Sequence, residues 1–143
     1  MTFDEVDRFI KKGDVVALRR ALDQGVSPNL AHRFSCTLLM SAALGGNTRV
    51  GRLLIERGAS VDHANNRGET ALWHAAHMGQ TSFVELLLEH GASPECCPYA
   101  ASLESWLDSA SGLPKSRIIA IMRLINTVRN QKEPRDKSNI ASL

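Results

Sequence analysis

The chain has 143 residues, enough for one domain or a short array of structural repeats. It is 43% hydrophobic but only 5% aromatic, so small and aliphatic side chains must form most of its core. The formal net charge is +2, and residues 1–128 carry 13 basic and 13 acidic residues. This balance argues against a nucleic-acid-binding protein, which needs a basic face to neutralise phosphates.

Neither the N-terminal segment nor the cysteines indicate an exported protein. The N-terminus lacks the apolar stretch of a signal peptide, and no run approaches the roughly 20 apolar residues that span a bilayer. Cys36, Cys96 and Cys97 are odd in number and two of them are adjacent, which argues against a disulfide framework. We therefore expect a cytoplasmic protein with reduced thiols and no membrane partner.

Several kinds of residue recur at a spacing of 33 positions. The recurring sets are Gly13, Gly46 and Gly79; Gly25, Gly58 and Gly91; Thr37 and Thr70; Leu39 and Leu72; Ala42 and Ala75; Ala43 and Ala76; Asn29 and Asp62. Because independent residue types share one register, the sequence predicts a repeated structural unit.

The units are expected in chain order as helix pairs. The first, residues 2–31, has helices over 3–12 and 15–24, with Gly13 in the turn and charged outer positions typical of a capping repeat. The second, residues 32–64, opens its first helix after Thr37. The third, residues 65–97, has helices over 71–78 and 81–90, with hydrophobic residues at helical spacing.

The C-terminal part follows the same pattern less closely. After Cys97 the register slips by one residue, so that Trp106 aligns with Leu72. We interpret residues 98–130 as a degenerate closing repeat whose second helix, over 116–130, packs a broad apolar stripe on the core. The alternative is that an exposed remainder of this stripe serves as a second docking site. Residues 131–143 are polar and are expected to be disordered.

The best-preserved unit contains "GETALWHAA", a turn glycine and "VELLLEHGAS". It resembles the ankyrin repeat. The resemblance implies an all-α ankyrin-repeat solenoid over residues 1–130, with about four helix-turn-helix repeats including degenerate caps at both ends. Two departures stand out: Leu38 and Ala71 replace the family's proline, and Met40 and Trp73 replace its histidine. The resemblance therefore leaves open whether the two internal repeats keep the bracing that this histidine provides, with more apolar packing as the alternative.

His74 and His77 lie three residues apart and could share one face of a helix as part of a metal site or an acid–base pair. No third ligand is close in sequence, and the cysteines form no Cys-x-x-Cys motif. We therefore expect no metal, no cofactor and no catalytic residue. An enzyme or metal protein built on the two histidines remains the alternative from a different functional class.

The resemblance implies that a partner protein binds the concave side formed by the loops and first helices. The residues expected there are Arg33, Phe34, Cys36, Leu44, Asn66, Arg67, Glu69, Trp73, His77, Met78 and Tyr99. Phe34 has two interpretations, an anchor for a partner or a side chain folded back on the neighbouring repeat. The predicted function is stoichiometric protein binding that regulates or inhibits the partner. An immunity-type inhibitor of a toxin enzyme is a narrower alternative. The chain is expected to be monomeric alone and heteromeric with its partner.

Overall fold

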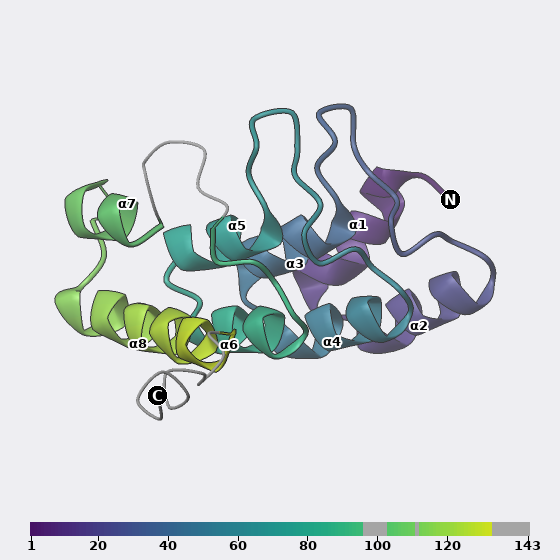
Figure 1. Ribbon diagram of the computed structural model, residues 1–143. Helices are drawn as coiled ribbons and strands as arrows, with labels where there is room; N and C mark the ends of the chain where they lie inside the picture. Colours follow the sequence, from purple (N-terminus) through teal and green to yellow (C-terminus); the bar gives the residue numbers. More distant parts are fainter. Residues whose placement is uncertain (96–102, 111, 133–143) are drawn as a thin grey trace, which may run out of the picture.

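A computed structural model of the chain describes residues 1–95, 103–110 and 112–132 (Figure 1). It contains eight helices in these ranges: α1 (Phe3–Lys12), α2 (Val15–Asp23), α3 (Leu38–Gly45), α4 (Thr48–Glu56), α5 (Ala71–His77), α6 (Thr81–Glu89), α7 (Leu103–Ala110) and α8 (Lys115–Lys132).

The helices form two layers joined by long loops. In Figure 1, α1, α3 and α5 lie in a row above α2, α4, α6 and α8, and the connections from α2 to α3 and from α4 to α5 project beyond the first row. Within the rows, α3 packs against both α1 and α5, and α4 packs against both α2 and α6. We call α1, α3, α5 and α7 the inner helices and the other four the outer helices.

Local sequence signals explain where the inner helices begin. Thr2 and Glu5 form a capping box at the start of α1, in which each side chain accepts a hydrogen bond from the other residue's backbone N–H. Thr37 and Thr70 cap α3 and α5, where each Oγ1 accepts from the backbone N–H three residues later. The 33-residue spacing of these threonines thus marks equivalent helix starts.

Small residues let the helices approach closely. Ala42, Ala43, Ala75 and Ala76 are almost completely buried on α3 and α5. In the outer row, a Cβ added to Gly51 of α4 would lie 2.5 Å from Cζ of Phe83 on α6. A chain with few aromatic residues therefore obtains a dense core from short side chains and one close helix approach.

Polar side chains at equivalent positions join neighbouring repeats. Asn29 accepts a hydrogen bond from the Ser60 backbone N–H at 2.7 Å and donates one to the Gly58 carbonyl at 3.1 Å. One period later, Asp62 accepts from the Ser93 N–H at 2.8 Å. The pair of recurring polar residues seen in the sequence therefore satisfies loop amides of the following repeat.

The last outer helix differs from expectation in length and packing. α8 runs to Lys132, so residues 131 and 132, which were expected in a disordered tail, are helical, and residues 133–143 lie outside the described part of the chain. Of the expected apolar stripe, Ile121 and Ile125 are buried, whereas Ile118, Met122, Leu124 and Val128 are half-buried. The burial is incomplete because α8 lies at the end of the row, where α6 and α7 are its main packing partners among the described helices.

Candidate protein-binding surface

Two projecting loops, residues 30–37 and 63–70, have the same hydrogen bonds at positions 33 apart. We call them finger 1 and finger 2. The shared bonds are His32 N–H to Cys36 O and Ser35 N–H to His32 O in finger 1, and Asn65 N–H to Glu69 O and Gly68 N–H to Asn65 O in finger 2. In each turn, one residue has a left-handed backbone conformation. This residue is Gly68 in finger 2 and Ser35, with φ of 61°, in finger 1. A backbone bond from Asn66 N–H to Phe34 O, 3.0 Å long, joins the two fingers.

The tips of the fingers carry exposed residues of the type that anchors interfaces. Phe34 is 59% exposed, and the guanidinium carbon of Arg33 lies 5.8 Å from the centre of its ring. Asn66 and Arg67 are exposed on the neighbouring tip. The exposure of Phe34 contradicts the interpretation in which it folds back on a neighbouring repeat. Arg33, Phe34, Asn66 and Arg67 thus form one continuous surface, which we call the fingertip patch.

Leu44 and Met78, which were also expected to face a partner, lie at the C-terminal ends of the inner helices α3 and α5, away from the fingers. We call these two residues the helix-end patch. Leu44 near the end of α3 is 42% exposed, and Met78 after α5 is 44% exposed. Their helix ends are adjacent, since Gln80 Nε2 donates to the Leu44 carbonyl at 3.3 Å. Leu44 also borders a hollow of about 390 Å³ between the ends of α1 and α3, whose other lining residues include Lys11 and Lys12. At 1.5 Å per residue, the eight residues of α3 put about 12 Å between this helix-end patch and the base of finger 1, and the fingertips lie further away.

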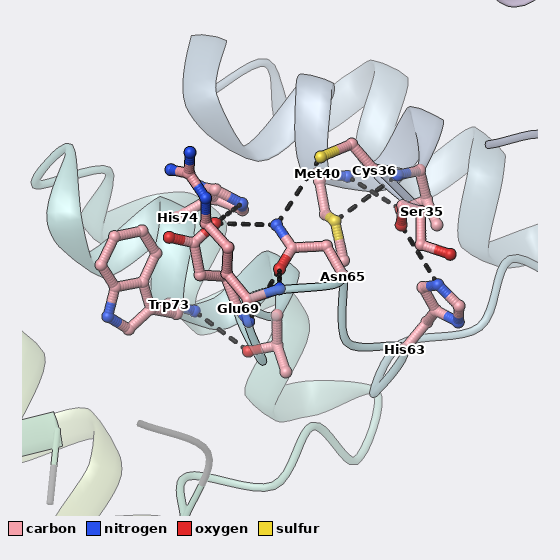
Figure 2. Close-up of polar contacts among 11 residues, drawn as sticks. Ser35, Cys36, Met40, His63, Asn65, Glu69, Trp73 and His74 are labelled. Carbon is pink, nitrogen blue, oxygen red and sulfur yellow. Dashed lines mark hydrogen bonds and ion pairs between the residues drawn. The ribbon is translucent and has the colours of Figure 1, made fainter. Parts of the chain in front are cut away.

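Glu69 is not part of the surface, and the expectation that it faces a partner is corrected. Glu69 is only 6% exposed, and its Oε2 accepts a 2.7 Å hydrogen bond from Asn65 Nδ2 (Figure 2). Asn65 Oδ1 accepts from the backbone N–H groups of Arg67 at 2.9 Å and Glu69 at 3.0 Å. Asn65 Nδ2 also lies 3.6 Å from Sγ of Cys36, whose thiol is half-buried. Glu69 and Cys36 therefore help to hold the base of the fingers.

His74 adjoins this buried cluster on α5. Its Nε2 lies 3.7 Å from Glu69 Oε2. Burial lowers the pKa of His74, while the carboxylate of Glu69 acts in the opposite direction. The desolvation effect is the larger one, so the neutral imidazole is favoured beside the carboxylate.

Trp73 and His77 take part in an aromatic cluster with Trp106 of α7. The rings of Trp73 and His77 stack with centroids 4.9 Å apart and planes 10° from parallel, and Trp106 lies 5.0 Å from His77 and 5.5 Å from Trp73. Trp73 is only 7% exposed, so its expected place on the binding surface is corrected, and His77 is half-buried. Nδ1 of His77 has no hydrogen-bond partner among the residues that the structure describes.

The positions at which the resemblance leads one to expect histidine are braced differently in the two repeats. In the repeat of α3, Met40 Sδ accepts a 3.4 Å hydrogen bond from the Thr37 backbone N–H, and Thr37 Oγ1 accepts from the Met40 N–H. The thioether thus supplies an acceptor at the helix start, so this repeat keeps a bond between the position of the family's histidine and the capping threonine. In the repeat of α5, Trp73 extends away from the cap into the aromatic cluster.

The two histidines do not converge on a shared ligand. His74 faces Glu69, whereas His77 stacks on indole rings. Across the described ranges, no group of three or more His, Cys, Asp or Glu side chains is placed to hold a metal ion. Tyr99, Cys96 and Cys97 lie outside the described residues. None of the described helices is both long and apolar enough to cross a bilayer.

Sequence reasoning missed the organising role of Asn65 and the contact of Trp106 with His77. A signal for Asn65 was present, because asparagine commonly accepts hydrogen bonds from backbone amides two residues on in turns. The partnership of Trp106 with His77 had no such signal, because the register slips in the fourth unit and obscures which residues face each other.

Comparisons with known proteins agree with this architecture. A family model described as ankyrin repeats in three copies matches residues 8–96. Among solved structures, the ankyrin repeat domain of human ASB11 superposes with a TM-score of 0.69 at 24% sequence identity, covering 90% of this chain and 54% of that one. The chain thus spans about half the length of that structure, and the likeness concerns the fold. No curated protein matches. The layered helix pairs, the repeated fingers and the family match show together that the chain belongs to the ankyrin repeat family, whose members are generally non-enzymatic protein–protein interaction modules.

Proposed function

We propose that the chain binds one partner protein stoichiometrically through the fingertip patch and the helix-end patch. The observation that carries this proposal is the exposure of Phe34 at a loop tip beside Arg33. Aromatic and arginine side chains supply a large share of the energy of protein interfaces. Burying Phe34 in a partner would also remove apolar surface that water now solvates unfavourably.

The charge of the fingertip patch favours an acidic partner surface. Arg33 and Arg67 are both exposed there, and the residue that could neutralise them locally, Glu69, is turned inward onto Asn65. Lys12 is exposed beside the helix-end hollow, whereas Lys11 forms a 2.6 Å ion pair with Asp7. A partner that presents carboxylates next to an apolar side chain would match both patches.

The binding itself is the proposed activity, and it regulates or inhibits the partner. The domain extends over residues 1–130 in this proposal, with the first and fourth units as caps. We propose that the protein acts in the cytoplasm, where the free thiol of Cys36 stays reduced. The chain alone is proposed to be a monomer that forms a heteromer with its partner.

The test begins with the full chain as bait, compared directly with a Phe34→Ala variant. Proteins captured by the wild type and lost with the variant are identified by mass spectrometry and titrated by calorimetry. We expect Phe34→Ala and Arg67→Ala each to weaken binding by about 1–3 kcal/mol with the fold intact. Gln24→Ala, an exposed change at the end of α2, is the control. Unchanged affinity in both finger variants would place the interface elsewhere.

A further inference from the structure

A hollow on the outer helices gathers three arginines. It has a volume of about 330 Å³ and lies between α2 and α4. Its lining residues are Val15 and Arg19 of α2 and Thr48, Arg49, Arg52, Leu53 and Glu56 of α4. These helices lie in the row opposite the fingers in Figure 1, so this hollow is distinct from the fingertip patch, whereas its residues Val15 and Thr48 follow closely on Gly13 and Asn47 of the helix-end hollow. We call it the arginine hollow.

The three guanidinium groups of the hollow have no carboxylate partner within 4 Å among the described residues. Arg19 has Asp23 one turn further along α2, but Asp23 pairs with Arg57 at 2.7 Å. All three arginines are exposed. The structure therefore keeps three positive charges against the single negative charge of Glu56 around one small volume.

This arrangement opposes the stability of the fold. Arg19 and Arg52 are 33 residues apart, so stacking the repeats sets like charges at equivalent positions of neighbouring helices. Arg49 lies in the first turn of α4, which contains no acidic residue, and a cation there faces the positive end of the helix dipole. By contrast, α1 has Asp4 and Glu5 in its first turn. An anion in the hollow would relieve both repulsions.

We propose that the arginine hollow binds a phosphorylated serine or threonine of a partner protein. A phosphate monoester carries close to two negative charges and three acceptor oxygens, which match several guanidinium groups better than one carboxylate does. The small volume suits a single side chain. Glu56, which also lines the hollow, repels a continuing polyanion and so disfavours nucleic acid or an anionic membrane.

The probe is a fluorescent peptide library degenerate around one fixed phosphoserine, measured with the full-length chain by anisotropy. Libraries with serine or glutamate at the fixed position are run alongside. We expect binding of the phosphoserine library and at least about tenfold weaker binding of the other two. A phosphoserine library that binds no better than the serine library overturns the proposal.

Three variants separate a defined site from a general basic field. Arg52→Gln should weaken phosphopeptide binding about tenfold, whereas Glu56→Gln should strengthen it severalfold by removing a repulsion. Arg20→Gln is the matched control, because Arg20 is exposed on α2 but does not line the hollow, and its effect should stay within about twofold. Equal losses for Arg20→Gln and Arg52→Gln would overturn the proposal.

Melting temperatures of the same variants test whether weaker binding comes from loss of the fold. Because Arg52 is unpaired beside like charges, Arg52→Gln should leave the melting temperature unchanged or raise it, so weaker binding cannot come from unfolding. A single-stranded oligonucleotide and vesicles containing phosphatidylserine complete the set. If either binds more tightly than the phosphoserine library and loses this binding in Arg52→Gln, the hollow serves a different class of ligand and the proposal fails.

Discussion

Asn65→Ala should destabilise the protein strongly, because one side chain completes four contacts at the base of the fingers. The lost bonds are two from backbone amides to Oδ1, one from Nδ2 to the Glu69 carboxylate at 2.7 Å, and a weak one to Cys36. Each amide bond contributes about 1 kcal/mol and the bond to the carboxylate about 1.5–3 kcal/mol, so we expect a loss of about 3–5 kcal/mol. Domains of this kind are stable by about 5–15 kcal/mol, so this loss is a large fraction.

The adjacent Asn66 provides the matched control for this prediction. Its side chain is exposed, and its known contact with finger 1 is made by its backbone N–H, which alanine retains. Asn66→Ala should therefore change stability by less than about 0.5 kcal/mol. Urea denaturation followed by circular dichroism, with Trp73 and Trp106 fluorescence as a second probe, gives both free energies of unfolding.

Asn65→Asp tests the role of the donor separately. Aspartate keeps the size and the Oδ1 acceptor, but it replaces the donor to Glu69 with a second carboxylate. We expect it to be at least as destabilising as Asn65→Ala at neutral pH. If Asn65→Ala and Asn66→Ala have the same free energy of unfolding, or if Asn65→Asp resembles the wild type, the buried cluster does not hold the fingers as argued.

Three further predictions concern packing, backbone strain and pH. Gly51→Ala should cost about 1–3 kcal/mol because its Cβ would lie 2.5 Å from a ring atom of Phe83, whereas Gly45→Ala, with no atom within 4 Å, should be neutral or stabilising in the same melts. Ser35→Gly should raise stability by about 0.5–1 kcal/mol, because Ser35 has φ of 61°, and a lower melting temperature would show that its side chain contributes more than its backbone strain. Burial lowers the pKa of His74, so the unfolded chain binds more protons just below the ordinary histidine pKa. Stability should therefore fall as pH drops below about 6.5 and be fully present above it, and His74→Gln should flatten that slope in denaturation curves at several pH values.

The 33-residue register predicted the fold because the residues that define it act locally. Thr37 and Thr70 cap helices through their own side chains, and Ala42 and Ala75 are small wherever inner helices meet. Each such role depends on the residue type and on its position within the unit, both of which are visible in a single sequence. The same reasoning fails at α8, whose expected apolar stripe lacks a neighbour on one side.

The surface was harder to predict because the same position in two repeats need not face the same way. Cys36 and Glu69 are 33 residues apart, yet Cys36 is half-buried and Glu69 is buried. The reason lies in Asn65, whose amide reaches both side chains, whereas its counterpart His32 contacts the aromatic rings of Phe3 and Phe34. Burial of a finger residue thus depends on whether asparagine or histidine stands at the base of its own finger, a difference that the 33-residue period does not encode.

The fingertip patch and the arginine hollow differ in how the fold positions their side chains. Finger positions are held by their backbones, as the Asn66 N–H to Phe34 O bond shows, so the side chains at the tips are free to vary without loss of the fold. Outer-helix positions such as Arg19 and Arg52 are fixed by the stacking of the repeats, and their like charges are set side by side whether or not a ligand is present. A fingertip substitution should therefore change affinity with little effect on stability. Replacing an arginine of the hollow should lower affinity for the phosphopeptide while leaving stability unchanged or higher, so affinity and stability do not fall together on either face.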